Sequence, residues 1–276
     1  MITDVLARDT TVQRLEAPEH PVPEAASSAL AAYPADLSGD YYVTVLKKLA
    51  KTRSVKRYLE VGVNKGNCFS QIACERAIGV DPAFELKENV TNGKKDVRLF
   101  QMPSDAFFEE VDVRAALGGP VDLAFLDGLH QFEYLLRDFY NTERLCAPNS
   151  LIAMHDCLPV SETMMSRSIS DTMRLSKGTR HEGWWTGDVW KVIAILRKFR
   201  PDLRIVCLDA APTGLVFVSN LDPANTALSR DYCRIVDEFA SVPNTLQAVS
   251  EVYETQPILP TSAILNGFDH SLYFRA

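Results

Sequence analysis

Acidic and histidine side chains gather where buried strands are expected to end. Glu60, Asp81 and Asp127 each stand at the end of a short apolar run, and His155 and Asp156 follow a fourth run. The carboxyl ends of parallel strands meet at one edge of a sheet, so these side chains should converge there. Carboxylates at such an edge can bind ribose hydroxyls or a divalent metal ion. The pattern therefore predicts a ligand site at this edge.

A glycine turn follows the first of these acids, in the stretch Glu60-x-Gly62-x-x-x-Gly66. A dinucleotide site needs the spacing G-x-G-x-x-G, because the pyrophosphate must approach a helix N-terminus closely. Val61 and Asn64 stand where further glycines would be expected, and the Gly-Lys-Ser/Thr sequence of a P-loop does not follow. An acid directly before the turn also favours a cationic ligand group over a phosphate.

The second acid, Asp81, lies about 20 residues beyond the turn. An open α/β sheet places there the carboxylate that binds ribose hydroxyls. Each position also has a purely structural interpretation. Gly62 and Gly66 would permit a tight turn, and Asp81 would cap a helix that begins at Pro82. As an ordered set, the residues favour cofactor binding.

The elements that carry these residues follow from hydrophobic periodicity. Strands alternating with helices, followed by a hairpin, predict a doubly wound, Rossmann-like, mostly parallel sheet of seven strands with an antiparallel edge hairpin. A helix is expected after the glycine turn, with Phe69, Ile72 and Ala73 on its inner face, and a polar turn at residues 103–105. Further helices are expected near residues 229–240 and 245–254. The predicted strands cover residues 57–61, 77–81, 95–101, 121–127, 151–154, 203–208 and 215–219.

Composition excludes several classes of protein. A formal net charge of -7 argues against a general nucleic-acid binder. No apolar run approaches membrane-spanning length, and the N-terminus lacks the pattern of a secretory signal. The six cysteines show no metal-binding or disulfide spacing, which favours reduced thiols and a cytoplasmic location. The expected partner is thus a small molecule, without nucleic acid or membrane; the oligomeric state stays open, a homo-oligomer included.

The glycine turn and the sequence GVDP at 79–82 resemble the cofactor site of class I S-adenosylmethionine-dependent methyltransferases, over roughly residues 55–222. Four further stretches are similar to the branch with the macrocin-type sugar O-methyltransferases and the cephalosporin hydroxylase-like proteins. They are FLDGLHQFEYLLRDF (125–139), LIAMHDC (151–157), GDVWK (187–191) and PTGLVFVSNLDP (212–223).

The resemblance implies a role for each residue of the cofactor site. The two glycines would let the backbone approach the methionine part of S-adenosylmethionine, with the Glu60 carboxylate near its ammonium group. Asp81 would bind the ribose, and Ser104 and Asp105 would lie near the adenine. The implied cofactor-binding residues are Glu60, Gly62, Gly66, Asp81, Ser104, Asp105 and Asp127.

Asp127 and Asp156 follow adjacent parallel strands, and two carboxylates with a few waters suit Mg²⁺. In the related branch, acids at these places hold a divalent metal, but a histidine, His155, stands here beside the second acid. His155 as a third ligand would shift the preference toward Mn²⁺, Fe²⁺ or Zn²⁺. In a metal-free site, His130 or His155 would act as general base. The structural alternatives are a His130 bonded to nearby backbone and a His155 packed against Asp156.

The predicted function is methyl transfer from S-adenosylmethionine to a hydroxyl of a small molecule, such as a sugar or natural product, with or without a divalent metal. The alternatives are a hydroxylase-like protein of the same fold and a non-catalytic S-adenosylmethionine-binding protein. A nicotinamide dehydrogenase is a third alternative, which the glycine spacing disfavours. Residues 1–37 are predicted to form an arm or cap, 38–222 the methyltransferase domain, and 223–276 a helical extension and tail. Acceptor specificity is expected from residues 157–187, where Trp184 and Trp185 are candidates for a lid or stacking wall.

Overall fold

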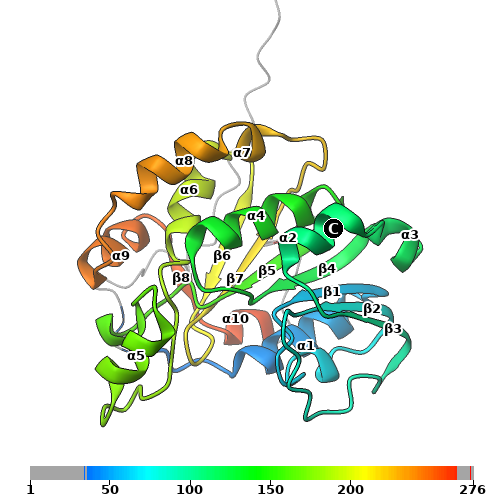
Figure 1. Cartoon of the computed structure of the whole chain (residues 1–276), viewed down its shortest axis with the longest axis horizontal. Helices are drawn as coiled ribbons and strands as arrows, with labels where there is room; N and C mark the ends of the chain where they lie inside the picture. The colour runs from blue at the N-terminus through cyan, green and yellow to red at the C-terminus, as the bar shows by residue number, and fades with distance from the viewer. Residues whose placement is uncertain (1–33, 35, 266–273, 275–276) are drawn as a thin grey trace, which may run out of the picture.

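The computed structural model describes residue 34, residues 36–265 and residue 274, so most of the predicted arm at 1–37 lies outside the described residues. Its centre is one sheet with the strand order β3-β2-β1-β4-β5-β7-β6-β8 (Figure 1). The strands are β1 (Arg57–Val61), β2 (Cys74–Val80), β3 (Lys94–Phe100), β4 (Val121–Leu126), β5 (Cys146–His155), β6 (Arg204–Leu208), β7 (Leu215–Ser219) and β8 (Ile258–Leu259).

The first five strands are mutually parallel, and β7 runs antiparallel to both β5 and β6. This confirms the predicted mostly parallel sheet with an antiparallel edge hairpin. The predicted number of seven strands is wrong, because β8 pairs with β6 as an eighth strand. Since β8 has two residues, it is too short to produce a recognisable hydrophobic alternation.

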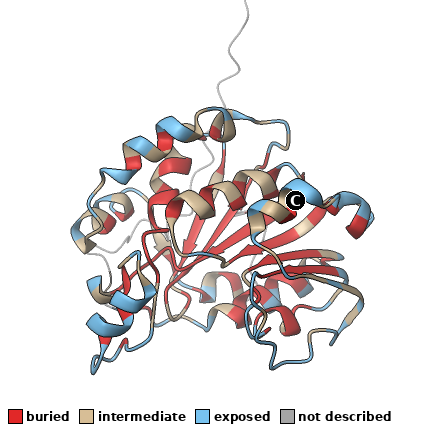
Figure 2. Ribbon diagram, viewed as in Figure 1, coloured by how far each residue is buried: buried red, intermediate tan, exposed pale blue. Residues whose placement is uncertain are grey.

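Helices cover both faces of the sheet (Figure 1), and Figure 2 shows that central strands such as β4 and β7 are almost entirely buried. The edge strand β3 has no buried residue. One layer contains α2, α4, α6 and α8, and the other contains α1 and α10. Strand residues alternate between the layers: Leu59 and Val61 contact the α4 side, whereas Tyr58 contacts the α1 side. The helices are α1 (Tyr42–Thr52), α2 (Ser104–Glu110), α3 (Val113–Leu117), α4 (Phe132–Glu143), α5 (Ile169–Ser176), α6 (Lys191–Phe199), α7 (Ala227–Arg230), α8 (Tyr232–Ala240), α9 (Leu246–Tyr253) and α10 (Ser262–Leu265).

The strand order reverses at β1, which has β2 on one side and β4 on the other. The turn after β1 is tied to both neighbours: Gly62 N donates to Val80 O, and Asp127 N donates to Val61 O, each at 2.8 Å. Gly62 has a φ of +88°, and a Cβ atom there would lie 1.9 Å from the carbonyl oxygen of Asp127. Only glycine fits this position. The carboxyl ends of β1, β2 and β4 therefore lie side by side at the switch point.

The helix predicted after the glycine turn is wrong. The chain makes only a single 3₁₀ turn, η2 (Phe69–Gln71), before β2 begins at Cys74. β2 starts three residues earlier than predicted, so the segment before it is shorter than expected. Helix α1 packs with Phe69 and Ile72 in the same core cluster and so covers this face instead. The predicted polar turn at 103–105 is also wrong, since Ser104 already begins α2.

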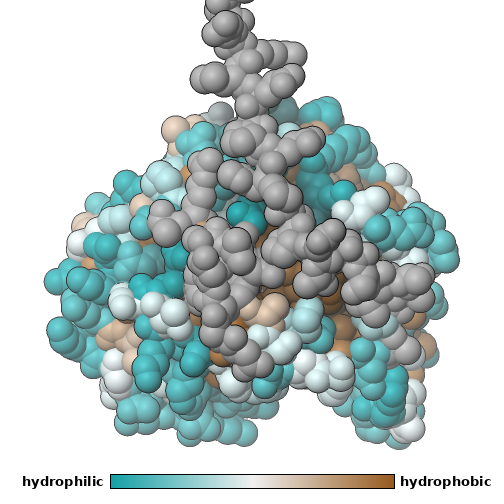
Figure 3. All heavy atoms as spheres, turned by 180° about the vertical axis from the view of Figure 1, so that it is seen from behind, coloured by the Kyte–Doolittle hydropathy of each residue, from teal (hydrophilic) through white to brown (hydrophobic). Residues whose placement is uncertain are grey.

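The C-terminal part packs against the sheet. The predicted helices near 229–240 and 245–254 are confirmed by α8 and α9, while β8 makes the segment more than a helical extension. Seen from behind, hydrophilic residues make up most of the described surface (Figure 3). In the described part of the chain, no helix has both the length and the apolar character to cross a membrane. All six cysteines are described, and each is a free thiol.

Candidate active site

A cavity of about 480 Å³ opens at the carboxyl edge, over the switch point between β1 and β4. Its size is within the usual range for small-molecule sites. Larger grooves of about 650 Å³ beside α6 and α9 and about 700 Å³ along α1 lack a histidine among their described lining residues. The cavity is lined by Val61, Gly62, Asn64, Val80, Asp81, Pro82, Pro103, Ser104, Asp105, Asp127, Gly128, Leu129, His130, Tyr134, Ile169 and Trp185.

Five of the seven predicted cofactor-binding residues line this cavity: Gly62, Asp81, Ser104, Asp105 and Asp127. The Asp81 carboxylate is fixed by backbone groups. Its Oδ2 accepts from the N–H of Asn64 at 2.7 Å and its Oδ1 accepts from the N–H of Ala83 at 2.8 Å. Each carboxylate oxygen has a further lone pair, so the side chain stays able to accept from two ligand hydroxyls.

Asp105 faces the cavity but is already engaged. Both of its oxygens accept from the Arg137 guanidinium at 2.8 Å, in the bidentate geometry typical of arginine and carboxylate. Ser104, at the first position of α2, lines the cavity beside it. The Ser104 side chain makes a hydrogen bond with the buried Asp138 carboxylate, so both side chains already have a partner within the protein.

Glu60 and Gly66 are not among the lining residues. Glu60 is 1% exposed and faces the α1 layer, where the Tyr58 hydroxyl donates to it at 2.5 Å. Burial raises the pKa of this carboxyl to about 8, although the hydrogen bond from Tyr58 acts in the opposite direction. Gly66, with a φ of +82°, lies against Val90 and Leu86. Both residues thus shape the turn without lining the cavity.

Two aspartates and two histidines meet at one end of the cavity. His130 Nε2 lies 3.2 Å from Asp156 Oδ2 and 3.6 Å from Asp127 Oδ1. His155 Nδ1 lies 3.3 Å from Asp127 Oδ1 and 3.4 Å from Asp156 Oδ2. Asp127 and His130 follow β4, whereas His155 ends β5 and Asp156 follows it. The parallel pairing of β4 and β5 brings the two pairs together.

The carboxylates and imidazoles of this cluster stabilise each other's charged forms. Burial alone would lower the pKa of His155, but the carboxylates of Asp156 and Asp127 raise it to about 10. The pKa of His130 is likewise raised by Asp156 and Asp127 against the effect of burial. Burial would raise the pKa of Asp127, yet His155 and His130 hold it well below its ordinary value. His155 is therefore held as an imidazolium beside both carboxylates, and each imidazole stabilises the carboxylates that it contacts.

The orientation of the His130 ring follows from its second nitrogen. Nδ1 lies 2.6 Å from the carbonyl oxygen of Trp185, and a carbonyl can only accept, so Nδ1 carries the proton of this bond. In the neutral ring, the lone pair is then on Nε2, which faces the two aspartates. The Trp185 ring lies 4.7 Å from the His130 ring, and it lines the cavity as predicted for a wall. Trp184 instead packs against His181.

In the described part of the chain, the atoms that lie close enough together to hold a metal come from Asp127, His130 and Asp156, all within 4.8 Å of one another. The sequence predicted Asp127, His155 and Asp156. His155 touches the same carboxylates, but its Nε2 points toward the Thr213 hydroxyl at 3.5 Å.

Two residues of this cluster were missed by sequence reasoning. Tyr42, at the start of α1, packs against His155 with ring centroids 4.0 Å apart and the ring planes tilted by 33°. The Thr213 hydroxyl donates to Asp156 Oδ1. In the sequence, Tyr42 is one apolar residue on a helix face, so nothing near it indicates that it belongs to a site. Thr213 belongs to the stretch PTGLVFVSNLDP, whose resemblance to the branch is the one available signal.

Comparison with known proteins identifies the domain that carries this site. Residues 59–157 match the model of a methyltransferase domain, and this span runs from β1 to just beyond β5. No curated protein matches the sequence.

Several solved structures are similar to this chain at low identity. An O-methyltransferase from Bacillus cereus in complex with SAH is 13% identical, with 70% of this chain and 85% of that chain covered and a TM-score of 0.46. Cofactor-bound Rv0187 from MTB is 16% identical, with 67% and 80% covered and a TM-score of 0.47. The MycE methyltransferase in complex with Mg, SAH and mycinamycin VI is 17% identical, with 67% and 50% covered and a TM-score of 0.40.

Proposed function

We propose that this S-adenosylmethionine-dependent methyltransferase transfers the methyl group to a hydroxyl oxygen of a small molecule, such as a sugar or natural product. The observation that carries the proposal is the shape of the site. One cavity extends from Asp81 to the cluster of Asp127 and His130. A cofactor bound along it would have its ribose at one end and its reactive group near residues that can accept a proton.

The cavity fits the cofactor by the chemistry of its donors. The Asp81 carboxylate is fixed at the end of β2 and has lone pairs left for the two ribose hydroxyls. Ser104 and the apolar side chains of Pro82 and Pro103 line the same part of the cavity. We assign the ribose to Asp81 and the adenine to this neighbouring surface. When bound, S-adenosylmethionine supplies an electrophilic methyl group.

Glu60 and Gly66 have an indirect role in this proposal. Their backbone shapes the turn under the cofactor. Gly62 is the residue of this turn whose backbone would approach the cofactor most closely. Since the Glu60 side chain faces the α1 layer, we place the contact with the ammonium group on other atoms of the turn.

The acceptor hydroxyl would be bound beside His130 and Asp127, where both side chains line the cavity. Transfer forms a bond between the acceptor oxygen and the methyl carbon, breaks the bond between that carbon and the cofactor sulfur, and releases the hydroxyl proton. His130 Nε2 in its neutral form would take this proton, and the carboxylates of Asp127 and Asp156 would stabilise the resulting imidazolium. His155 would hold both carboxylates in place from the other side.

The cluster also fits a divalent metal ion. Asp127, His130 and Asp156 offer two oxygens and one nitrogen within 4.8 Å, a set that suits Mn²⁺, Fe²⁺ or Zn²⁺ better than Mg²⁺. His130 would be oriented for this role, because ligating histidines usually donate their other N–H to a carbonyl or carboxylate. A metal there would lower the pKa of the acceptor hydroxyl.

Calorimetry and a turnover assay test the proposal. S-adenosylmethionine and its demethylated product S-adenosylhomocysteine should bind, while NAD should give no heat. A panel of sugars and phenolic or polyketide alcohols should contain an acceptor that gains a methyl group on oxygen. Cofactor binding without methylation of any acceptor would leave a non-catalytic binding protein, and binding of NAD alone would overturn the proposal.

A further inference from the structure

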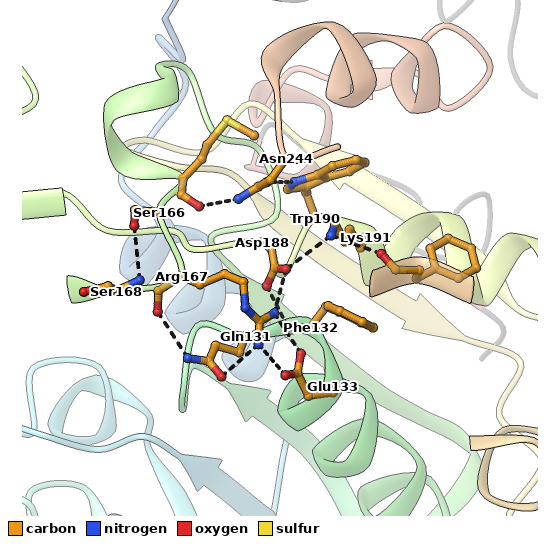
Figure 4. A network of polar contacts seen from close by, with 12 residues as sticks. Gln131, Phe132, Glu133, Ser166, Arg167, Ser168, Asp188, Trp190, Lys191 and Asn244 are labelled. Atoms are coloured by element: carbon orange, nitrogen blue, oxygen red, sulfur yellow. Dashed lines mark hydrogen bonds and ion pairs between the residues drawn. The ribbon is translucent and has the colours of Figure 1, made fainter. Parts of the chain in front are cut away.

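A cluster of ion pairs joins the segment after β5 to the start of α4 (Figure 4). The Arg167 guanidinium donates to both carboxylate oxygens of Glu133, and to Asp188 Oδ2 at 2.7 Å. It also donates to Gln131 Oε1, and Gln131 Nε2 donates back to the Arg167 carbonyl, both at 3.1 Å. Asp188 Oδ1 accepts from the N–H of Phe132 at 3.0 Å. We call Gln131, Glu133, Arg167 and Asp188 the Arg167 clasp.

The clasp is built around a buried charge. The side chain of Asp188 is 0% exposed, and Lys191 Nζ, also buried, lies 3.3 Å from Asp188 Oδ2. Lys191 is itself held by the carbonyl of Phe239 at 3.1 Å. Surface ion pairs contribute little, but removing one partner of a buried pair leaves an uncompensated charge. Arg167 and Lys191 together balance the carboxylates of Asp188 and Glu133, so loss of Arg167 leaves one carboxylate in excess.

Each of the two chain segments that the Arg167 clasp joins contacts His130 or adjoins it in the chain. Gln131 follows it in the chain, and the Trp185 carbonyl accepts from His130 Nδ1 at 2.6 Å. The Trp185 indole donates to the carbonyl of Ser166, the residue before Arg167, at 2.6 Å. Gly187 packs so tightly on this loop that a Cβ atom would lie 1.7 Å from the His130 carbonyl oxygen. The two chain segments that the clasp joins are thus the two that fix the ring.

We propose that Arg167 and Asp188 are positioning residues that hold His130 Nε2 toward Asp127 and Asp156. The inference rests on the proposed function, in which His130 accepts the proton or binds a metal. Breaking the clasp would separate the loop that carries His130 from the segment that carries Trp185. The ring would then lose its fixed orientation, while the cofactor half of the cavity around Asp81 would be unaffected.

The test uses the full-length protein with Arg167→Gln, Arg167→Lys and Glu133→Gln. Arg174→Gln is the matched control, because Arg174 lies in the same segment and pairs with Asp171 at 3.2 Å rather than with α4. Two readouts are compared: the ¹⁵N-histidine NMR signal of the His130 Nδ1–H, assigned by its loss in His130→Gln, and methyl-transfer kinetics.

The Arg167→Gln and Glu133→Gln variants should lose the Nδ1–H signal, and kcat should fall by about 10- to 100-fold, as expected for misplaced catalytic groups. The dissociation constant of S-adenosylhomocysteine should stay within about twofold of wild type. Arg167→Lys keeps the charge without the planar fork, so its kcat should be intermediate. Arg174→Gln should resemble wild type in every readout.

An intact Nδ1–H signal in both Arg167→Gln and Glu133→Gln would overturn the inference, whatever happens to their melting temperatures. A fall in kcat with an unchanged signal would also overturn it, since the effect would then not pass through His130. If no acceptor is ever methylated, the proposed function fails, but the NMR comparison still decides whether the clasp orients the ring.

Discussion

Replacing Glu60 by glutamine tests how the turn under the cofactor is built. Glu60 is buried on the α1 side of the sheet, and its pKa is raised from the ordinary value of 4.5 to about 8. At neutral pH the folded protein therefore keeps this carboxyl protonated, whereas the unfolded chain releases the proton. Glutamine has nearly the same shape, can accept the Tyr58 hydrogen bond and does not ionise.

The size of the stability difference between Glu60→Gln and wild type follows from proton linkage. Below pH 4.5 both states bind the proton, so this part of the stability is fully present. Between 4.5 and about 8 the unfolded state alone loses the proton, and wild-type stability falls by about 1.4 kcal/mol per pH unit, or about 5 kcal/mol in total. The stability advantage of Glu60→Gln should grow by about 3 kcal/mol between about pH 5.5 and about pH 8.5.

Urea denaturation of wild type and variant at the two pH values measures this change directly. Glu75→Gln is the control for removing a carboxyl outside the core, since Glu75 is exposed on β2 and pairs only loosely with Lys95 at 3.5 Å. A gap between Glu60→Gln and wild type that stays constant with pH would refute the reasoning. Glu60 would then be ionised in the folded protein, as a direct contact with the cofactor ammonium requires.

Three further predictions concern the cavity. Asp81→Asn should weaken S-adenosylhomocysteine binding by about 10- to 100-fold in calorimetry, the loss expected for hydrogen bonds to a charged group. Asp105→Asn is the control, because Arg137 already occupies both Asp105 oxygens; equal losses in the two variants would remove Asp81 from the ribose site. Asp127→Asn should lower turnover by at least about 100-fold with cofactor affinity nearly unchanged. Treatment with a chelator should lower turnover until Mn²⁺ is returned. Full activity after chelation would exclude the metal but leave His130 as the general base. Ile169→Asp, at a side chain that is 51% exposed on the cavity rim, should raise the acceptor KM several-fold without changing cofactor affinity, whereas Met173→Asp on the same helix, outside the lining, should leave KM unchanged.

The sheet and its ligand edge could be predicted because they depend on local patterns. Apolar runs of strand length and their terminal acids are visible in the sequence, and parallel topology forces the ends together. Gly62 was identifiable for the same reason, since the switch point requires a turn that only glycine can make. The orientation of Glu60 was also readable in principle, because side chains two residues apart in a strand share a face, and Tyr58 is apolar in character.

The remaining parts of the site depend on contacts between distant residues. The ring of His130 is oriented by a carbonyl 55 positions away, and Thr213 reaches Asp156 across 57 positions. Tyr42 packs against His155 from a helix that precedes the whole sheet. Periodicity describes which way a side chain faces within its own element, so it cannot predict such pairs. The helix expected after Gly66 did not form, because Phe69 and Ile72 are buried from a 3₁₀ turn and the residue that follows it. Burial of apolar side chains therefore did not require an α-helix.

The central claim is that one cavity brings the cofactor to the cluster of Asp127 and His130. A crystal structure of the protein grown with S-adenosylhomocysteine and Mn²⁺ tests it most directly. We expect density for the ribose at Asp81, with the sulfur directed toward His130 and an anomalous peak among Asp127, His130 and Asp156. Cofactor density elsewhere, such as in the groove along α1, with the cavity filled only by water, would contradict it.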